Sequence, residues 1–283
     1  MASASATTSS DRAAAAPPGA TPVIERRFQE LRARGRRALV VYLTAGHPDP
    51  ARSVELLHAV TEAGADVVEV GVPFSDPMAD GPIIQASSQA ALEHGMTLDG
   101  TLSLIASARL TVPVVLFTYL NPLLAAGRDV LDRAAAAGTH GVLVTDLPVG
   151  ADPEREAWLG ASPLAFVRLV APTTPPARMA EIARHGSGFV YLISRLGVTG
   201  VRDDLPPELP KTVAALRGAT PLPICVGFGI SRPEQAAAVG AIADGVVVGS
   251  AVVRAAGESV ERTRALVASL RSALDQAPEP RHA

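Results

Sequence analysis

Short apolar runs bounded by turn residues alternate with longer segments of helical spacing along most of the chain. Runs this rich in Val, Leu and Ile are typical of strands that are buried on both faces, as in a parallel sheet. Eight such runs occur, at Ala38–Leu43, Val67–Val70, Val114–Phe117, Gly141–Val144, Ala165–Leu169, Phe189–Ile193, Leu222–Val226 and Gly245–Val248.

The segments between these runs predict helices. They lie at Ser53–Ala63, Leu98–Ala108, Val130–Ala137, Pro153–Leu159, Pro176–Arg184, Lys211–Arg217, Pro233–Val239 and Val260–Leu274, after a leading helix at Ile24–Arg34. A strand followed by a helix at intervals of roughly 25–30 residues predicts an α/β protein with the (β/α)8 architecture of a TIM barrel. A doubly wound open sheet is the alternative.

Two connections are longer than the others. One covers residues 71–111 and contains an extra helix at Ile83–Glu93, and the other covers residues 194–210, where we also expect an extra helix. Barrel enzymes build their sites from the loops at the carboxyl ends of the strands, so the added length falls where function is expected. We expect loops 71–82 and 194–210 to form both a lid and a partner surface; ordinary solvated loops are the alternative.

Composition indicates a single globular domain over residues 23–276, with tails at 1–22 and 277–283. The first tail holds mainly Ala, Ser, Thr and Pro, which predicts disorder. No apolar stretch approaches the ~20 residues of a membrane helix, and with a net charge of -3 and interspersed Arg and acids we expect neither a membrane nor a nucleic-acid partner. The single cysteine, Cys225, excludes an internal disulfide and agrees with a cytoplasmic location.

A carboxylate, Glu69, stands inside the second apolar run. Burial without a partner raises the pKa of a carboxyl group towards neutrality, where it can both give and take a proton. A second carboxylate, Asp80, follows in a loop that Pro73, Pro77 and Pro82 stiffen. The two indicate an acid/base couple; a structural carboxylate paired with Arg, or an Asp serving a turn, is the alternative.

Three glycine-rich turns follow the last three predicted strands, at Gly197–Gly200, Gly227–Ser231 and Gly249–Ser250. Glycine lets backbone N–H groups approach an anion, and a helix that opens at Ser250 or Ser231 adds its N-terminal dipole. The turns predict a phosphate site, although glycine also serves tight strand-to-helix turns.

The lysine and histidine residues of the chain limit the reaction classes that the site can catalyse. The only lysine, Lys211, follows a proline-rich loop at a helix start, which leaves no credible Schiff-base nucleophile. The six histidines are scattered without metal-ligand spacing, so we expect no metal. What remains is carboxylate acid/base catalysis on a phosphorylated small molecule, with Tyr42, Tyr119, Tyr191 and Phe228 as possible walls for a flat group.

One long motif is specific. The run Val-Glu-Val-Gly-Val-Pro-Phe-Ser-Asp-Pro-Met-Ala-Asp-Gly-Pro-Ile-Ile-Gln ends at Gln85. It resembles the signature of the tryptophan synthase alpha subunits, and the resemblance extends from about Ile24 to the last helix. Further matching segments are Thr44–Pro48, Thr118–Pro122, Thr145–Pro148, Tyr191–Gly200 and Gly227–Ser231.

The resemblance implies a retro-aldol cleavage of indole-3-glycerol phosphate to indole and D-glyceraldehyde 3-phosphate, with no cofactor in this chain. It also implies a pyridoxal-phosphate beta subunit in an alpha2-beta2 complex, which receives indole for the last step of L-tryptophan biosynthesis. Glu69 and Asp80 are then the catalytic residues. The implied substrate contacts are Tyr42, Ile84, Tyr119 and Phe228 around indole, Tyr191 near Glu69, Thr199 around the closed ligand, and Gly200, Gly229, Gly249 and Ser250 at phosphate.

Two departures from the family pattern stand out. Tyr42 occupies a position where Phe is familiar, and Leu196 one where a small or hydroxyl residue is. Two other hypotheses stay open at this point: a stand-alone lyase that releases indole, and a barrel that serves only as a non-catalytic activating subunit. The presence of both Glu69 and Asp80 argues against the second.

Overall fold

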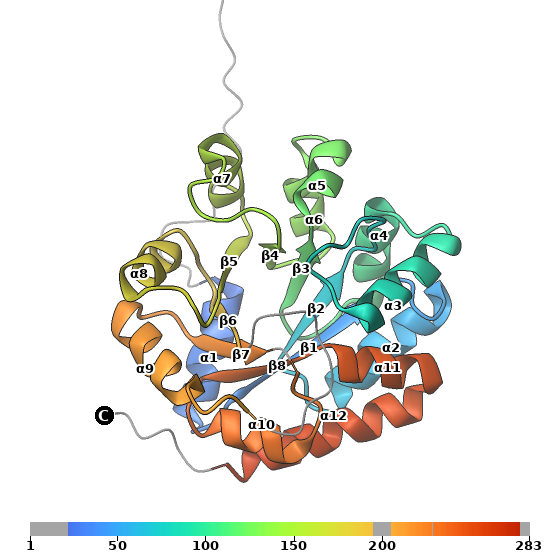
Figure 1. Cartoon of the computed structure of the whole chain (residues 1–283). Helices are drawn as coiled ribbons and strands as arrows, with labels where there is room; N and C mark the ends of the chain where they lie inside the picture. The colour runs from blue at the N-terminus through green and yellow to red at the C-terminus, as the bar shows by residue number, and fades with distance from the viewer. Residues whose placement is uncertain (1–21, 195–204, 228, 278–283) are drawn as a thin grey trace, which may run out of the picture.

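The computed structural model describes residues 22–194, 205–227 and 229–277, and its strands form one closed barrel (Figure 1). Each strand pairs in parallel with the next, and β8 pairs with β1, which confirms the predicted (β/α)8 fold. The strands are β1 (Ala38–Thr44), β2 (Val67–Gly71), β3 (Val114–Thr118), β4 (Gly141–Val144), β5 (Ala165–Val170), β6 (Val190–Ile193), β7 (Ile224–Gly227) and β8 (Gly245–Val248).

Both faces of the strands are buried, for two different reasons. In β1, Leu39, Val41 and Leu43 belong to the core between the strands and the surrounding helices. Ala38 and Val40 belong instead to the core inside the barrel. Successive side chains of a strand point to opposite faces, so a strand that is covered on both sides reads as a continuous apolar run.

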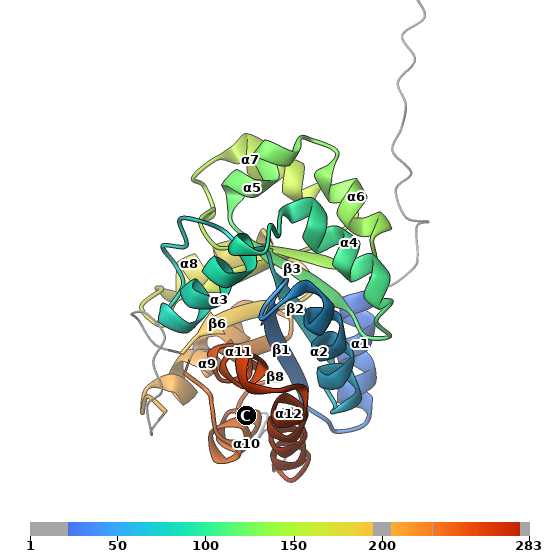
Figure 2. The same cartoon turned by 90° about the vertical axis from the view of Figure 1, so that its right-hand side faces the viewer.

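The helix α1 (Val23–Ala33) closes the end of the barrel at which the strands begin. Its buried side chains Ile24, Phe28 and Leu31 belong to the interior core, and the Phe28 ring lies 5.6 Å from the Phe189 ring. Figure 2 shows α1 and α3 (Pro82–Glu93) on opposite sides of the strands. The amino-terminal floor of the barrel is therefore sealed, and the opposite end is left for a site.

Most of the outer helices match the predicted segments. They are α2 (Pro50–Glu62), α4 (Leu98–Ala108), α6 (Val130–Ala136), α7 (Pro153–Gly160), α8 (Pro176–Arg184), α9 (Leu209–Ala219), α10 (Pro233–Gly240) and α12 (Val260–Asp275). The extra helix predicted after β2 is present as α3. The segment for which an extra helix was predicted after β6 lies largely at residues 195–204, outside the described residues.

Two short helices were absent from the predicted helical segments, although a helix opening at Ser250 was expected at the phosphate site. α5 (Leu120–Ala126) follows β3 and contains Asn121-Pro122, a pair typical of turns, although proline is also tolerated in the first turn of a helix. α11 (Ser250–Glu258) follows β8 after one glycine and is amphipathic, with Val252 and Val253 buried. Both helices lie at the carboxyl ends of strands.

One hydrogen bond recurs four times on the barrel floor. A side chain just before each even-numbered strand accepts the backbone N–H at the start of the preceding odd-numbered strand. The pairs are Leu39 N to Asp66 Oδ2 at 2.9 Å, Val114 N to His140 Nδ1 at 3.2 Å, Phe166 N to Ser187 Oγ at 2.8 Å and Ile224 N to Asp244 Oδ2 at 2.9 Å. These floor bonds satisfy strand amides that would otherwise be buried unpaired.

Asp66 also holds two arginines. Arg27 Nη2 donates to Asp66 Oδ1 at 2.6 Å, and Arg271 Nη1 donates to Oδ2 at 2.8 Å. The Asp66 side chain is only 2% exposed, so its charge is compensated by partners instead of water. The floor is therefore held together by a buried charge network.

Over the described residues, no helix combines the length and the apolar character that crossing a membrane requires.

Candidate active site

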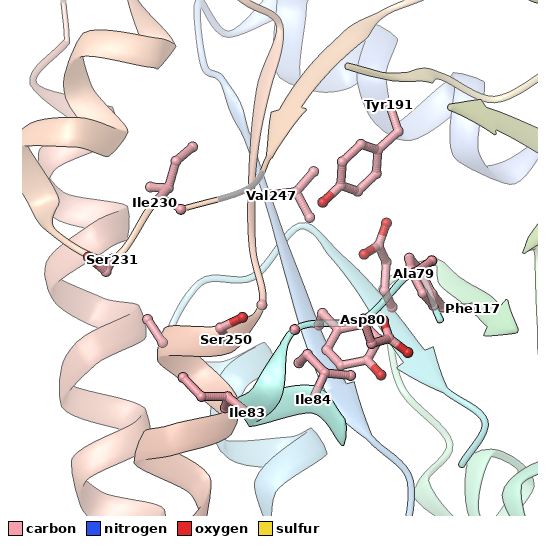
Figure 3. A pocket seen from close by; sticks show the side chains of 16 residues that line it. Ala79, Asp80, Ile83, Ile84, Phe117, Tyr191, Ile230, Ser231, Val247 and Ser250 are labelled. Atoms are coloured by element: carbon pink, nitrogen blue, oxygen red, sulfur yellow. The ribbon is translucent and has the colours of Figure 1, made fainter. Parts of the chain in front are cut away.

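A pocket opens at the carboxyl ends of the strands, with about 680 Å³ of empty space including its mouth. Figure 3 shows Asp80, Phe117 and Tyr191 on one side of it and Ile230 and Ser231 on the opposite side. Its walls are mainly apolar, and few polar groups reach it. The lining residues are Tyr42, Glu69, Ala79, Asp80, Gly81, Ile83, Ile84, Phe117, Tyr191, Gly229, Ile230, Ser231, Val247, Gly249, Ser250 and Ala251.

Glu69 stands in the middle of β2 and points into this pocket. Its side chain is 1% exposed, and its Oε1 atom is buried without a hydrogen-bond partner. Burial raises the pKa of the Glu69 carboxyl to about 8. A carboxyl group with such a pKa is protonated over much of the neutral range and can take its proton back after giving it.

Asp80 lies in the loop between β2 and α3, and its side chain is held by Tyr119. The Tyr119 hydroxyl donates to Asp80 Oδ2 at 2.9 Å and accepts from the Ala79 N–H at 3.0 Å. Burial raises the pKa of the Asp80 carboxyl to about 6, and the bond from Tyr119 opposes that rise. Asp80 is therefore ionised at neutral pH while the Glu69 carboxyl keeps its proton.

Two tyrosines lean across the barrel interior onto glycines of the following strand. A Cβ atom at Gly71 of β2 would lie 2.0 Å from the Tyr42 hydroxyl oxygen, and one at Gly227 of β7 would lie 2.3 Å from that of Tyr191. Only glycine leaves this space. The Tyr42 ring also packs edge-on against Phe117, at 5.1 Å between centroids. The phenol groups are thus fixed inside the mouth of the barrel.

The glycine turns lie opposite the carboxylates. Gly229 has a φ of 83°, a left-handed conformation that other residues rarely adopt. The amides of Ser231 and Arg232 donate to Gln235 Oε1. The N-cap of α11, Gly249, provides no side-chain hydrogen bond, so the dipole of α11 faces the pocket at Ser250 without a side-chain cap. This end of the pocket suits an anion.

Most residues predicted for the site line one pocket. Glu69, Asp80, Tyr42, Ile84, Tyr191, Gly229, Gly249 and Ser250 are all in its wall. Tyr119 lies behind Asp80 and contacts it through the hydrogen bond described above. Thr199, Gly200, Phe228 and Leu196 lie outside the described residues, as does most of loop 194–210.

Several lining residues were not predicted. They are Ala79, Gly81, Ile83, Phe117, Val247 and Ala251, while Ile230 and Ser231 belong to the turn Gly227–Ser231 that was predicted for phosphate. Phe117 pairs in register with Gly71, and Gly71 is two residues beyond Glu69 on β2. The alternation of faces along β2 and β3, counted from Glu69, would have identified Phe117 as an interior residue.

Within the described ranges, no group of three or more His, Cys, Asp or Glu side chains is arranged to hold a metal ion. The polar side chains of the pocket are carboxyl, phenol and serine groups, which are proton donors and acceptors. Chemistry at this site can therefore be derived from these groups and from backbone amides.

A closed barrel with its pocket at the carboxyl ends of the strands defines a (β/α)8-barrel enzyme. The family model described as "Tryptophan synthase alpha chain" matches residues 28–279 of the sequence. The chain therefore belongs to the tryptophan synthase alpha chain family.

Individual relatives agree with this assignment. The tryptophan synthase alpha chain of Laribacter hongkongensis is 47% identical over 260 residues, which cover 89% of this chain and 98% of that relative. The one from Chromobacterium violaceum is also 47% identical, over 87% of this chain and 97% of its own length. Among solved structures, Mycobacterium tuberculosis tryptophan synthase superposes with a TM-score of 0.83 at 36% identity, covering 90% of this chain and 99% of that one. The alpha subunit from Legionella pneumophila gives 0.82 at 35% identity, covering 90% of this chain and 99% of that one.

Proposed function

We propose that this chain is a carbon–carbon lyase that cleaves indole-3-glycerol phosphate to indole and D-glyceraldehyde 3-phosphate. One observation carries the proposal above the others: Glu69 is a buried carboxyl group whose Oε1 has no partner, and it lines the same pocket as a second carboxylate. A structural carboxylate at this depth would be expected to have a partner. A group that exchanges protons with a substrate has to keep an oxygen free.

The first step is protonation of the indole ring. The protonated Glu69 carboxyl gives its proton to C3 of indole, and the positive charge that develops on the ring nitrogen is stabilised by the Asp80 carboxylate, which accepts the N–H. A pKa of about 8 for Glu69 and about 6 for Asp80 puts both groups in the required state between these values. The ratio kcat/KM therefore follows a bell-shaped pH profile with limbs near these two values.

The second step breaks the carbon–carbon bond. The Glu69 carboxylate takes the proton of the glycerol hydroxyl next to C3, the carbonyl of glyceraldehyde 3-phosphate forms, and the bonding electrons return to the ring to give neutral indole. The proton that Glu69 gave to C3 stays on indole, and the proton that it gains restores its acid form. Atoms and charge balance without a further reactant.

The phosphate end of the substrate fits the opposite wall. Gly229, Gly249 and Ser250 offer backbone amides and one hydroxyl, and the start of α11 adds its dipole. The only lysine of the chain, Lys211, is 83% exposed in its ion pair with Glu208 and is not among the pocket's lining residues. Since no Lys or Arg is among the described residues that line the pocket, we expect neutral donors and a helix end to bind the dianion.

A partner subunit is the second part of the proposal. Among the described residues, the exposed large hydrophobic side chains are Met78 at 81% and Leu124 at 42%. Met78 is in the loop after β2, and Leu124 is in α5 after β3, so both lie beyond the carboxyl ends of strands. These side chains suit contact with a beta subunit in an alpha2-beta2 complex, in which the beta subunit carries pyridoxal phosphate and receives indole.

Product release from purified protein tests the function. We expect the chain to release indole and glyceraldehyde 3-phosphate in equal amounts, and to do so faster when a pyridoxal-phosphate beta subunit is added. Absence of cleavage with and without the beta subunit would contradict the proposal. Equal rates with and without the beta subunit would support the lyase activity but favour a stand-alone enzyme over an alpha2-beta2 complex.

A further inference from the structure

Two neighbouring loops at the mouth of the barrel meet beside Tyr119, which stands between β3 and α5. The residue before it is bonded to the segment that follows β4, because the Thr145 N–H donates to the Thr118 carbonyl at 3.0 Å. The residue after it is bonded to the same segment, because the Leu120 N–H donates to Asp146 Oδ1 at 2.8 Å. The backbone of Tyr119 is therefore fixed on both sides by two consecutive residues of another loop.

Asp146 supplies a cap that α5 does not take from its own sequence. The first N–H groups of a helix have no partner inside the helix, and a Ser, Thr, Asp or Asn at the N-cap position usually accepts one of them. The N-cap residue of α5 is Tyr119, whose side chain makes no such bond. The exposed carboxylate of Asp146, 26 residues beyond Leu120 in the sequence, accepts an amide of the first turn instead. The side chain of Tyr119 is thereby left for another contact.

That contact is with Asp80. The Tyr119 hydroxyl donates to Asp80 Oδ2 at 2.9 Å and accepts the Ala79 N–H at 3.0 Å. The Tyr119 ring also lies 5.0 Å from the ring of Phe74, in the same loop after β2. A hydrogen bond weakens steeply when its distance and angle change. A displaced Tyr119 backbone would therefore weaken the only printed side-chain bond of the Asp80 carboxylate among the described residues.

The segment after β4 is anchored in the core although Asp146 itself is exposed. Arg168 of β5 donates to the Leu147 carbonyl at 3.2 Å and to Glu156 Oε2 at 2.8 Å. The side chains of Arg168 and Glu156 are 4% and 8% exposed. Glu156 Oε1 also accepts the Gly150 N–H at 2.6 Å. A buried ion pair thus holds the residue next to Asp146, so the position of the Asp146 backbone is well defined.

We propose that Asp146 is a positioning residue of the lyase: by accepting the Leu120 N–H it holds Tyr119 in place, and Tyr119 in turn keeps the Asp80 carboxylate aimed into the pocket. The inference rests on the proposed function and extends it to a residue outside the pocket, since neither Tyr119 nor Asp146 is among the lining residues. Tyr119 then acts on the substrate through Asp80. The alternative is an aspartate that only stabilises α5, and the two roles differ in what they predict for the ionisation of Asp80.

The ionisation of Asp80 reports whether Tyr119 is in place. Burial raises the pKa of the Asp80 carboxyl to about 6, and the bond from Tyr119 opposes that rise, so loss of the bond should move the acid limb of kcat/KM to higher pH. Loss of the negative charge of Asp146 would by itself favour the Asp80 carboxylate and move the limb to lower pH. The direction of the shift therefore separates lost positioning from lost charge.

The other titratable groups near Asp80 leave the acid limb to it. Those that share the pocket or a contact with Asp80 are Glu69 of β2, Tyr42 of β1, Tyr191 of β6 and Tyr119. Burial raises the pKa of each of the three phenols above its usual value, so they keep their protons over the range of the acid limb. Burial raises the pKa of Glu69 to about 8, which is the alkaline limb.

The test is the pH profile of kcat/KM for indole-3-glycerol phosphate in the parent, Tyr119→Phe, Asp146→Ala and Asp146→Asn, with thermal melting to show that each variant is folded. Tyr119→Phe should move the acid limb up by roughly 1 pH unit, the effect of one hydrogen bond to a charged group. Asp146→Ala should move it up by about 0.5 pH unit, so that kcat/KM falls roughly 3-fold at pH values below the limb and less on the plateau. Asp146→Asn keeps an acceptor oxygen and should keep the limb close to that of the parent. An unmoved or lowered limb in Asp146→Ala would overturn the proposal, and so would an equal upward shift in Asp146→Asn.

A double variant tests the route through Tyr119. If Asp146 acts through the Tyr119 hydroxyl, Asp146→Ala combined with Tyr119→Phe should have the same acid limb as Tyr119→Phe alone. A further upward shift in the double variant would overturn this route.

Asp152→Ala is the matched control. Asp152 accepts the Arg155 N–H at 3.1 Å and caps α7, a helix whose first residues do not adjoin Tyr119 in the sequence. Its loss should lower the melting temperature about as much as Asp146→Ala does and leave the acid limb unmoved. An equal limb shift in Asp152→Ala would overturn the proposal, because loss of any cap would then suffice. If the parent chain does not cleave the substrate, the proposed function fails; if it does and Asp146→Ala has the acid limb of the parent, only this inference fails.

Discussion

Asp66 and Glu69 are three residues apart in the sequence, yet they have different roles. One stabilises the floor of the barrel, and the other lines the pocket at its mouth. Asp66 precedes β2 on the floor, is 2% exposed, and binds Arg27, Arg271 and the Leu39 amide. Glu69 lies farther along β2, is 1% exposed, and has an unpartnered Oε1. Equal burial therefore produces two different carboxylates. The carboxylate of Asp66 stabilises the fold, whereas the carboxyl group of Glu69 remains available for proton transfer.

The largest expected effect comes from removing the transferable proton at the mouth. Glu69→Gln keeps the shape of the side chain and should lower kcat by about 10²–10⁴-fold, the usual value of a positioned general acid or base, with KM little changed. Steady-state kinetics of indole release measures it. Asp80→Asn should also be severe. If Glu69→Gln keeps more than about a tenth of the parent kcat, the assignment of Glu69 as acid and base is wrong.

The corresponding change on the floor should affect stability and leave catalysis alone. Asp66→Asn leaves the buried Arg271 guanidinium without its compensating charge, which should cost roughly 3–5 kcal/mol of unfolding free energy, while kcat at a temperature where the variant is folded stays near the parent value. Denaturant unfolding and kinetics measure the two effects. Asp99→Asn is the matched control, since Asp99 pairs with Arg133 on the surface and is 70% exposed. Equal stability of Asp66→Asn and the parent would remove the distinction between floor and mouth.

The third expected effect is a gradual one, a change in how stability depends on pH. The pKa of Glu69 rises from 4.5 to about 8 in the folded chain, so between these values the folded state binds more protons than the unfolded one. Stability is then unpenalised below about pH 4.5 and falls as the pH rises towards 8, by up to about 1.4 kcal/mol per pH unit.

Glu69→Gln should remove this contribution, so the difference in melting temperature between variant and parent should shift in favour of the variant as the pH rises. Melting curves across the pH range measure it. Parallel curves for the two proteins would mean that the carboxyl group of Glu69 is not strained by burial.

The strands were predictable because a barrel strand is covered on both faces and leaves a continuous apolar run. The predicted run Leu222–Val226 overlaps β7, which begins only at Ile224, after Pro223, whose missing N–H keeps it out of the ladder. Of the two short helices, α5 was not predicted and α11 was expected only by its start at Ser250; both begin at turn-like residues. The local sequence pattern says little about such elements, because they pack at the carboxyl ends of the strands, a surface that exists only in the folded barrel.

Burial of Glu69 was also predictable, since it stands inside an apolar run, but its lack of a partner was not. Asp66 borders the same run, and its partner Arg271 is 205 residues away in the sequence. Nothing local indicates that Arg271 reaches Asp66 and not Glu69. The Tyr42 hydroxyl was equally hidden, because its place depends on Gly71 of the neighbouring strand. The resemblance to a family, and not spacing, supplied the roles of these residues.

The four floor bonds of Asp66, His140, Ser187 and Asp244 have a consequence for how the barrel can be divided. Each bond ties an odd-numbered strand to the even-numbered strand that follows it. The floor thus has a period of two strands. A circular permutant that opens the chain between β2 and β3 would keep every bonded pair continuous, whereas one that opens it between β1 and β2 would separate a pair and join it only through the new ends.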